Sequence, residues 1–188
     1  AEKIATIATQ KGLHAVDAPV TGGDAGAKAG TLTILVGGEE AAFTALQPVF
    51  KAMGKNIVYM GTAGAGQKTK MCNQIAIAGA LVGACEAFTY AKAGGLDVQK
   101  VYEAISTGMA GSAQMTKVVF KGLNSDYTPG FMLKHFIKDM NISSDTSKDY
   151  QVSLPVLNLV LKEAKTLEAK GLGTEGTQTL LKYYAKNK

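Results

Sequence analysis

The stretch that decides the fold is GTAGAGQKTKMCNQIAIAGALVGACEAFTYAK, residues 61–92, because the chain changes character there. Its first part, Gly61–Gly66, is rich in glycine and predicts a hinge between two domains. From Gln67 to Lys92 the pattern is continuously helical over about 26 residues, which exceeds the length of an average helix. This predicted helix is apolar nearly all round, which suits a helix buried between domains or between subunits.

The residues before the hinge alternate between helical and extended patterns. Apolar residues at helical spacing predict two helices, Glu2–Lys11 and Glu39–Met53. The segment TGGDAGAKAG, residues 21–30, is predicted to be a loop. Three strands are a poor independent sheet, so we predict that residues 1–61 are the C-terminal part of a larger α/β domain. The three predicted extended runs are His14–Val20, Thr31–Val36 and Asn56–Met60.

The residues after the hinge show no further strand pattern. Several helical stretches follow the long helix, so residues 62–188 are predicted to form an all-helical C-terminal domain. The further predicted helices are Val98–Ser106, Ser112–Leu123, Gly130–Ser147, Leu154–Lys170 and Thr174–Ala185.

The composition is that of a globular protein with a core, since 46% of the residues are hydrophobic and 19% are charged. The two cysteines, Cys72 and Cys85, are too few for a disulfide framework or a cysteine-rich zinc site, and no metal is expected. They lie on one predicted helix where they cannot meet, so both are predicted to be buried free thiols. No uninterrupted apolar run reaches the roughly 18 residues that a membrane span needs. We expect a cytoplasmic protein with no membrane partner.

The net charge of +5 raises the question of nucleic-acid binding. All 20 basic residues are lysines, and arginine, the side chain best suited to phosphate and base contacts, does not occur. The lysines are scattered without runs or interleaved aromatic residues. We therefore predict a solvated lysine surface and no nucleic-acid partner.

The glycine-rich hinge and the first turns of the long helix allow three interpretations. In a phosphate-binding loop the second glycine would be followed directly by lysine, but Gln67 intervenes. In a dinucleotide fingerprint the third glycine would stand where Thr69 stands. The third interpretation is a turn into a helix where Lys70 and Asn73 share a face and form a proton-transfer pair. From the residues alone, a solvated lysine at a polar helix start is favoured over this pair.

Three separated motifs resemble those of the β-hydroxyacid dehydrogenase family, which includes 3-hydroxyisobutyrate dehydrogenase and tartronate semialdehyde reductase. The run Asp17-Ala-Pro-Val-Thr-Gly-Gly23, followed by Leu35-Val36-Gly37-Gly38, resembles its substrate-binding signature. The pattern Gly64-x-Gly66-x-x-x-Lys70-x-x-Asn73 resembles its catalytic signature, and Phe131 with Lys138-Asp139 resembles its late motif. The resemblance extends over essentially the whole chain.

The resemblance implies a fold and an activity. The fold would be a Rossmann-type α/β remnant followed by an all-α C-terminal domain like that of 6-phosphogluconate dehydrogenase, without the half that carries G-x-G-x-x-G. The activity would be NAD- or NADP-dependent hydride transfer with a small carboxylate substrate, a β-hydroxy acid or its semialdehyde. These 188 residues alone would then have little activity. A homodimer or homotetramer is implied as well. The alternative is a non-catalytic helical dimerisation or interaction module that keeps the family fold.

The resemblance also assigns roles to residues of the catalytic signature. Lys70 would be the general acid/base, which requires that the pKa of its amine is lowered toward neutrality. Asn73 would position the lysine or the substrate. Gln74 would contribute to substrate binding, and it is a departure from the family because many relatives have a second asparagine there.

The other two motifs would bind the ligands. The loop Thr21-Gly22-Gly23 would hold the substrate carboxylate through backbone N–H groups and a hydroxyl, with threonine in place of the commoner serine. Phe131 and Lys138 lie seven residues apart and are predicted to share nearly one face of the helix over Gly130–Ser147. Phe131 would form a wall of the substrate pocket, Lys138 would approach the cofactor, and Asp139 would contact the substrate side or pair with a lysine.

Overall fold

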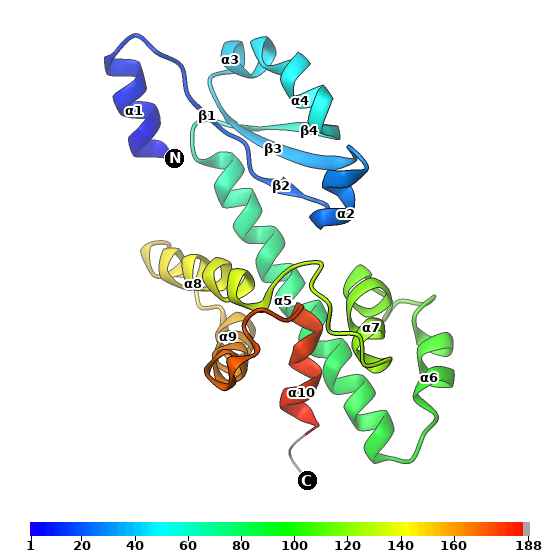
Figure 1. Cartoon of the computed structure of the whole chain (residues 1–188). Coiled ribbons are helices and arrows are strands. Elements are labelled where there is room, and N and C mark those ends of the chain that lie inside the picture. The colour runs from blue at the N-terminus through cyan, green and yellow to red at the C-terminus, as the bar shows by residue number, and fades with distance from the viewer. Residues whose placement is uncertain (186–188) are drawn as a thin grey trace. The chain divides into compact units, whose positions relative to one another are not determined.

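The structure, a computed structural model, describes residues 1–185. The chain forms two compact units, the first over Ala1–Asn73 and the second starting at Gln74. The first unit contains a four-stranded sheet and the second is mostly helical (Figure 1), which confirms the predicted fold class. The domain boundary after residue 61 stays a prediction, since the division between the compact units falls inside the long helix.

The first unit is built around its third strand. β3 (Leu32–Gly38) pairs in parallel with β4 (Gly54–Gly61) on one edge. On its other edge it pairs antiparallel with two short strands, β1 (Val16–Asp17) and β2 (Val20–Thr21). These two strands take the place of the single extended run predicted there, because Pro19 between them has no N–H to donate to a ladder.

Two differences from the sequence prediction concern the helices of this unit. The segment predicted to be a loop contains a short helix, α2 (Gly23–Lys28). The helix predicted over 39–53 is divided into α3 (Glu40–Ala45) and α4 (Gln47–Met53). Proline stands in the first turn of α4, where its missing N–H costs nothing.

The core of the first unit lies on one face of the sheet. Leu32, Ile34 and Val36 alternate along β3 and point to this face, where they pack with Phe50 of α4. In Figure 1 α3 and α4 lie together against the sheet. The N-terminal helix α1 (Glu2–Gln10) forms where it was predicted, but none of its residues is buried.

The second unit is organised around the long helix α5 (Ala65–Ala93), which begins two residues earlier than predicted. In the described part of this unit, the extended pairing is a single bridge between Met132 and Gly176. Its other elements are α6 (Val98–Ile105), the π-helix η1 (Met115–Val119), α7 (Phe120–Leu123), α8 (Leu133–Asp149), α9 (Pro155–Leu167), the π-helix η2 (Glu168–Leu172), the 3₁₀-helix η3 (Thr177–Leu180) and α10 (Leu181–Tyr184).

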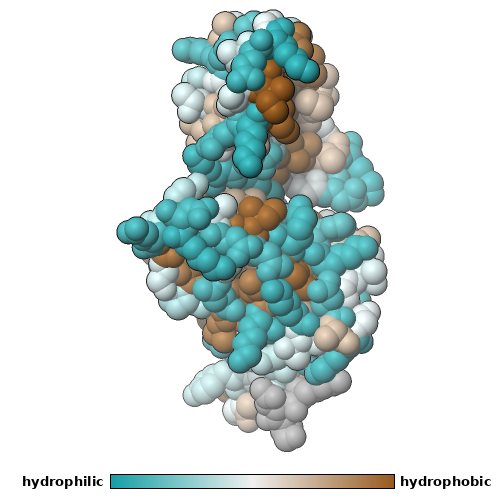
Figure 2. Space-filling view, turned by 90° about the vertical axis from the view of Figure 1, so that its left-hand side faces the viewer, coloured by the Kyte–Doolittle hydropathy of each residue, from teal (hydrophilic) through white to brown (hydrophobic). Residues whose placement is uncertain are grey.

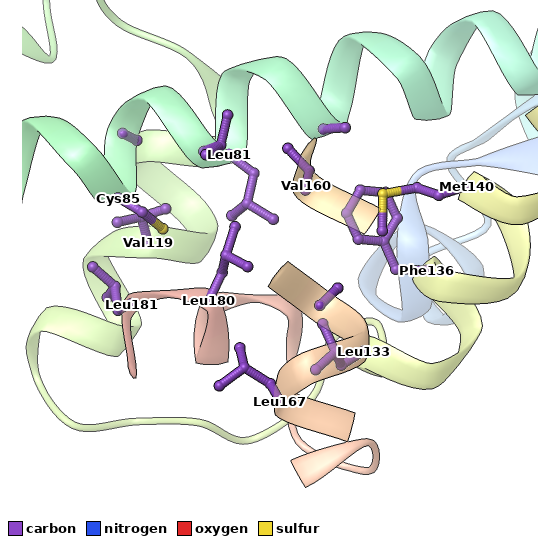
Figure 3. Packing of buried hydrophobic residues seen from close by; sticks show 14 of the residues in the cluster. Leu81, Cys85, Val119, Leu133, Phe136, Met140, Val160, Leu167, Leu180 and Leu181 are labelled. Atoms are coloured by element: carbon purple, nitrogen blue, oxygen red, sulfur yellow. The ribbon is translucent and has the colours of Figure 1, made fainter. Parts of the chain in front are cut away.

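Side chains from several helices meet in the core of the second unit. The cluster contains Leu81 and Cys85 of α5, Phe136 of α8, Val160 of α9 and Leu180 of η3, and Figure 3 shows Leu81 pointing toward Leu180. All five side chains are fully buried. The core therefore joins helices that are far apart in the sequence.

Within residues 1–185, α5 is the one helix whose length and composition would let it cross a membrane. The core helices of globular proteins share these properties, and Ala78, Leu81 and Phe88 of α5 are buried in the core just described. The thiol of Cys72 on the same helix is exposed, so the prediction that both cysteines are buried is wrong for Cys72. The first turns of α5 come before the part of the helix that is buried in this core. Gln67, Lys68 and Cys72 in these turns are exposed to solvent.

Hydrophilic side chains cover most of the face of the two units seen in Figure 2, with smaller hydrophobic areas between them. Some apolar side chains are exposed as well, among them Ile4 and Ile7, which lie three residues apart on α1. Most of the lysines in ion pairs, for example Lys28 with Asp24, are largely exposed, whereas the side chain of Lys182 beside Glu175 is 29% exposed. This distribution fits the scattered, solvated lysines expected from the sequence.

Candidate active site

Two glycines bring the start of α5 close to the strands of the first unit. Gly64 has a φ of +91°, a conformation that favours glycine. A Cβ on Gly66 would collide with the backbone oxygen of Leu35 in β3 and would lie 2.9 Å from the backbone oxygen of Asp17. The glycines of the motif therefore serve a tight turn and a close approach of two backbones, as the third interpretation of this segment expected.

The carboxylate of Asp17 in β1 contacts this turn directly. Its Oδ1 accepts a hydrogen bond from the N–H of Gly64 at 2.6 Å, and its Oδ2 accepts one from the N–H of Gln67 at 2.8 Å. Asp17 is only 8% exposed, and both of its oxygens have a partner. No role was predicted for Asp17 from the sequence. The signal that could have identified it is a single carboxylate inside the apolar strand segment VDAPV, since a buried charge needs partners.

Lys70 and Asn73 lie in α5 and are both partly buried. The helix is continuous over both positions, so their spacing of three residues places them on the same side of it, as predicted. Gln74 follows directly and is almost completely buried. The division between the compact units falls between Asn73 and Gln74.

The Thr21-Gly22-Gly23 segment joins a strand to a helix. Thr21 ends β2, and Gly22 and Gly23 have φ values of +131° and +63° as α2 begins. A Cβ on Gly22 would lie 3.2 Å from a methyl group of Leu32, so glycine is favoured there by both conformation and space. The backbone of this segment is exposed at both glycines.

In the second unit, Asp139 of α8 is a buried carboxylate with two partners. Gln74 Nε2 donates a hydrogen bond to Asp139 Oδ2 at 2.7 Å, and the Lys138 ammonium lies 2.9 Å from Asp139 Oδ1. The side chain of Lys138 is 65% exposed, whereas Asp139 is 6% exposed. Three predicted residues are thus brought together, and the pairing of Asp139 with a lysine is one of the two roles expected for it.

Phe131 is placed differently from the sequence prediction. It precedes α8 by two residues, so it does not share a helical face with Lys138. Its ring packs edge-on against the ring of Phe136 with the centroids 6.2 Å apart, and 38% of the residue remains exposed. The prediction failed because Leu133 begins the helix, while Met132 is extended and pairs with Gly176.

The predicted site residues do not line the three hollows found among the described residues 1–185. A hollow of about 370 Å³ in the first unit is lined by residues of α1 and by Asp17, Ala63 and Gln67 near the start of α5. A hollow of about 680 Å³ in the second unit is lined by one side of α9 and η2. The predicted residues are instead divided between the units, with Thr21 to Asn73 in the first and Gln74 to Asp139 in the second. Within residues 1–185 no three His, Cys, Asp or Glu side chains are grouped to hold a metal ion.

Comparison with known proteins identifies two family models along the chain. Residues 1–61 match the NAD binding domain of 6-phosphogluconate dehydrogenase. Residues 64–184 match the model described as NAD-binding of NADP-dependent 3-hydroxyisobutyrate dehydrogenase. Both descriptions name NAD binding, which confirms the predicted cofactor class, NAD or NADP, at the level of the family.

Two curated relatives align with nearly all of the chain. An uncharacterized oxidoreductase of Bacillus subtilis is 47% identical over 186 residues, which are 99% of this chain and 65% of the relative. A probable mitochondrial 3-hydroxyisobutyrate dehydrogenase-like protein of Arabidopsis thaliana is 45% identical over 181 residues, 96% of this chain and 54% of the relative. The chain thus spans between about half and two thirds of the length of these relatives.

A solved structure extends the likeness to the fold. The 3-hydroxyisobutyrate dehydrogenase of Mycobacterium tuberculosis, determined with L-serine, matches with a TM-score of 0.89 and 27% identity over 97% of this chain and 65% of that one. The family models, the relatives and the fold agree with the three motifs quoted from the sequence. The chain therefore belongs to the β-hydroxyacid dehydrogenase family, the family of 3-hydroxyisobutyrate dehydrogenase.

Proposed function

We propose that this chain is part of an NAD(P)-dependent dehydrogenase that interconverts a small β-hydroxy acid and its semialdehyde, with Lys70 as the general acid/base. The observation that carries the proposal is the lysine-and-amide pair, Lys70 and Asn73, in the first turns of a helix whose start is bonded to the carboxylate of Asp17 in β1. In a member of this family, a proton must be transferred together with the hydride. The pair provides a specific group for that proton transfer.

Lys70 would move the proton through its side-chain nitrogen, Nζ. In the oxidation direction a neutral amine takes the proton from the substrate hydroxyl, and in the reduction direction the ammonium returns it to the forming alkoxide. Lys70 is partly buried, and the oxidation direction requires its neutral amine. Asn73 lies one turn further on and can hold the substrate oxygen or the amine through its amide.

The Thr21-Gly22-Gly23 segment would hold the substrate carboxylate. The two glycines leave the backbone open to close approach, and the hydroxyl of Thr21 adds a donor. Backbone donors suit a chain without arginine, because it lacks the side chain that usually clamps a carboxylate. The methyl group that threonine adds relative to serine favours small substrates.

Lys138 is the residue that we propose to hold the cofactor. Its ammonium lies 2.9 Å from Oδ1 of the buried Asp139 and its side chain is largely exposed, so the ammonium can also donate to an anionic phosphate oxygen. When bound, the nicotinamide would accept or return the hydride. Gln74, Phe131 and Asp139 are proposed to contribute to the substrate side.

The remaining expectations from the sequence also stay proposals. We propose that the protein is cytoplasmic, that it assembles as a homodimer or homotetramer, and that residues 1–61 and 62–188 act as separate domains. We also propose that it binds neither nucleic acid nor membranes. The assembly is tested by light scattering coupled to gel filtration, where a monomer at micromolar concentration would contradict it.

The central test is the Lys70→Ala substitution in the protein that carries these 188 residues. Hydride transfer is followed by nicotinamide absorbance with L-serine, 3-hydroxyisobutyrate and their related semialdehydes as substrates. We expect turnover to fall by about 10²–10⁴-fold, the contribution typical of a general acid/base, while nucleotide affinity is retained. Lys68→Ala is the matched control, because Lys68 lies on the same helix and forms an exposed ion pair with Glu2. Unchanged turnover in Lys70→Ala would remove the catalytic assignment.

A further inference from the structure

We propose that Asp17 is a positioning residue for Lys70: its carboxylate fixes the first turn of α5, and thereby places the proton-transferring amine. This inference rests on the proposed role of Lys70. It assigns a role to Asp17, the first residue of the Asp17–Gly23 motif. Only the last three residues of this motif are proposed to bind substrate. Asp17 would position Lys70 through the helix, without contacting the substrate.

Every helix begins with N–H groups that have no partner within the helix. Gly64 is the N-cap of α5, since its carbonyl accepts the first helical hydrogen bond, from Lys68 N–H at 2.9 Å. An N-cap residue normally uses its own side chain to accept a bond from the third helical N–H, which here belongs to Gln67. Glycine has no side chain, so this helix cannot cap itself at that position.

Asp17 supplies what Gly64 lacks, from 47 residues upstream. In a capping box, two side chains of the helix satisfy the N-cap N–H and the third helical N–H reciprocally. Here one carboxylate from β1 takes both positions, with Oδ1 on the N–H of Gly64 and Oδ2 on that of Gln67. The negative charge also lies at the positive end of the helix dipole, where it is favourable.

The packing leaves this arrangement little freedom. Cβ atoms added to Gly37 of β3 or to Gly66 of α5 would lie within 2.9 Å of oxygen atoms of Asp17. The carboxylate is therefore enclosed by β3 on one side and by the first turn of α5 on the other. Because helix and strands touch through their backbones, the position of the first turn is set by this contact.

The same carboxylate links two functional motifs. Asp17 stands four residues before Thr21 in the strand region, and Lys70 stands six residues after Gly64 in an uninterrupted helix. A shift of the first turn is carried to Lys70, because the hydrogen-bonded helix moves as a rigid element. A misplacement of about 1 Å can cost a reaction about a hundredfold in rate, so the cap controls the rate as well as stability.

The first measurement tests the contact in the folded chain by amide hydrogen exchange. Asp17→Asn keeps the size of the side chain but removes the charge and one acceptor oxygen. We expect the amides of Gly64 and Gln67 to exchange at least about tenfold faster in this variant, because bonds to charged acceptors are the strong ones. Glu40→Gln, the same chemical change at an exposed position of α3, is the control and should leave both amides unchanged. Unchanged exchange in Asp17→Asn would overturn the inference.

The second measurement is a double-mutant cycle on turnover in the protein that carries this chain. We expect Asp17→Asn to lower kcat by about tenfold to a hundredfold, with nucleotide affinity unchanged, in the presence of Lys70. In the Lys70→Ala background the same substitution should lower kcat by less than about twofold, because a residue that acts through Lys70 has nothing left to position. If Asp17→Asn does not fold, Asp17→Glu replaces it, since the longer side chain keeps the charge but displaces both oxygens.

The outcomes separate the inference from the function on which it rests. An equal loss in both backgrounds, or no loss in either, would show that Asp17 does not act through Lys70 and would overturn the inference alone. Wild-type turnover in Lys70→Ala would overturn the proposed function, and the inference with it. A loss confined to the background that contains Lys70 supports both.

Discussion

Replacing Gly66 by alanine tests how closely α5 approaches the sheet. The new Cβ would collide with the backbone oxygen of Leu35 and would lie 2.9 Å from the backbone oxygen and from Oδ2 of Asp17, where ordinary contacts begin at 3.4 Å. The first turn of α5 would have to move away from both strands. The two hydrogen bonds to the Asp17 carboxylate would then be lost or lengthened.

The magnitude follows from those bonds. A hydrogen bond to a charged group contributes about 1.5–3 kcal/mol, and alanine in place of glycine returns about 1 kcal/mol of helix propensity. We therefore expect Gly66→Ala to lower the free energy of unfolding of the first unit by about 2–5 kcal/mol. Gly83→Ala is the matched control on the same helix, because a Cβ at Gly83 would meet nothing within 4 Å. It should raise stability by up to about 1 kcal/mol.

Both variants are compared by urea unfolding monitored by circular dichroism. Because the chain has two compact units, amide exchange in β3 reports on the first unit separately. If Gly66→Ala is as stable as Gly83→Ala, the close approach is not what requires glycine at this position, and the reasoning fails.

Two further predictions concern titratable groups of the helical region. Burial raises the pKa of the Cys85 thiol, whereas Cys72 is exposed. A thiol reagent should therefore modify one cysteine in the folded chain and two in denaturant. Two equally fast reactions under native conditions would contradict this prediction. Burial also raises the pKa of Glu163 above 4.5, and repulsion from Glu86 raises it further. The hydrogen bond from Tyr184 lowers this pKa but does not outweigh burial. The folded chain then holds this proton more tightly than the unfolded chain, so stability should fall as the pH rises from 4.5 through the raised pKa. Glu163→Gln should remove that fall, which urea unfolding at several pH values measures, and an unchanged pH dependence would show that another group is responsible.

The family and the fold class followed from the sequence because their signals are local. A helix of the length of α5 leaves a continuous pattern in the chain, and β-branched residues mark β3 as a strand. The motif containing Lys70 and Asn73 lies within one helix, so its geometry depends on helical spacing alone. For the same reason, the predicted glycine turn before the helix was found where expected.

The local errors have local physical causes. The glycine- and alanine-rich segment after Thr21 carries few apolar residues, so α2 leaves no periodic pattern. Phe131 was placed in a helix because its spacing to Lys138 fits one, but the extended Met132 pairs with Gly176, which is distant in the sequence. The exposure of Cys72 depends on where α5 leaves the core, and spacing on the helix carries no information about that.

Sequence by itself determined the two-part organisation, the long helix and the residues proposed to transfer protons and bind substrate. Only the tertiary structure identified Asp17, because its partners Gly64 and Gln67 come from a different element and contact it through backbone N–H groups, which have no signature in the sequence. The same holds for the bond between Gln74 and Asp139, which joins two helices across 65 residues. Spacing along one helix is encoded locally, whereas the partner of a buried charge is chosen by the packing of the whole unit.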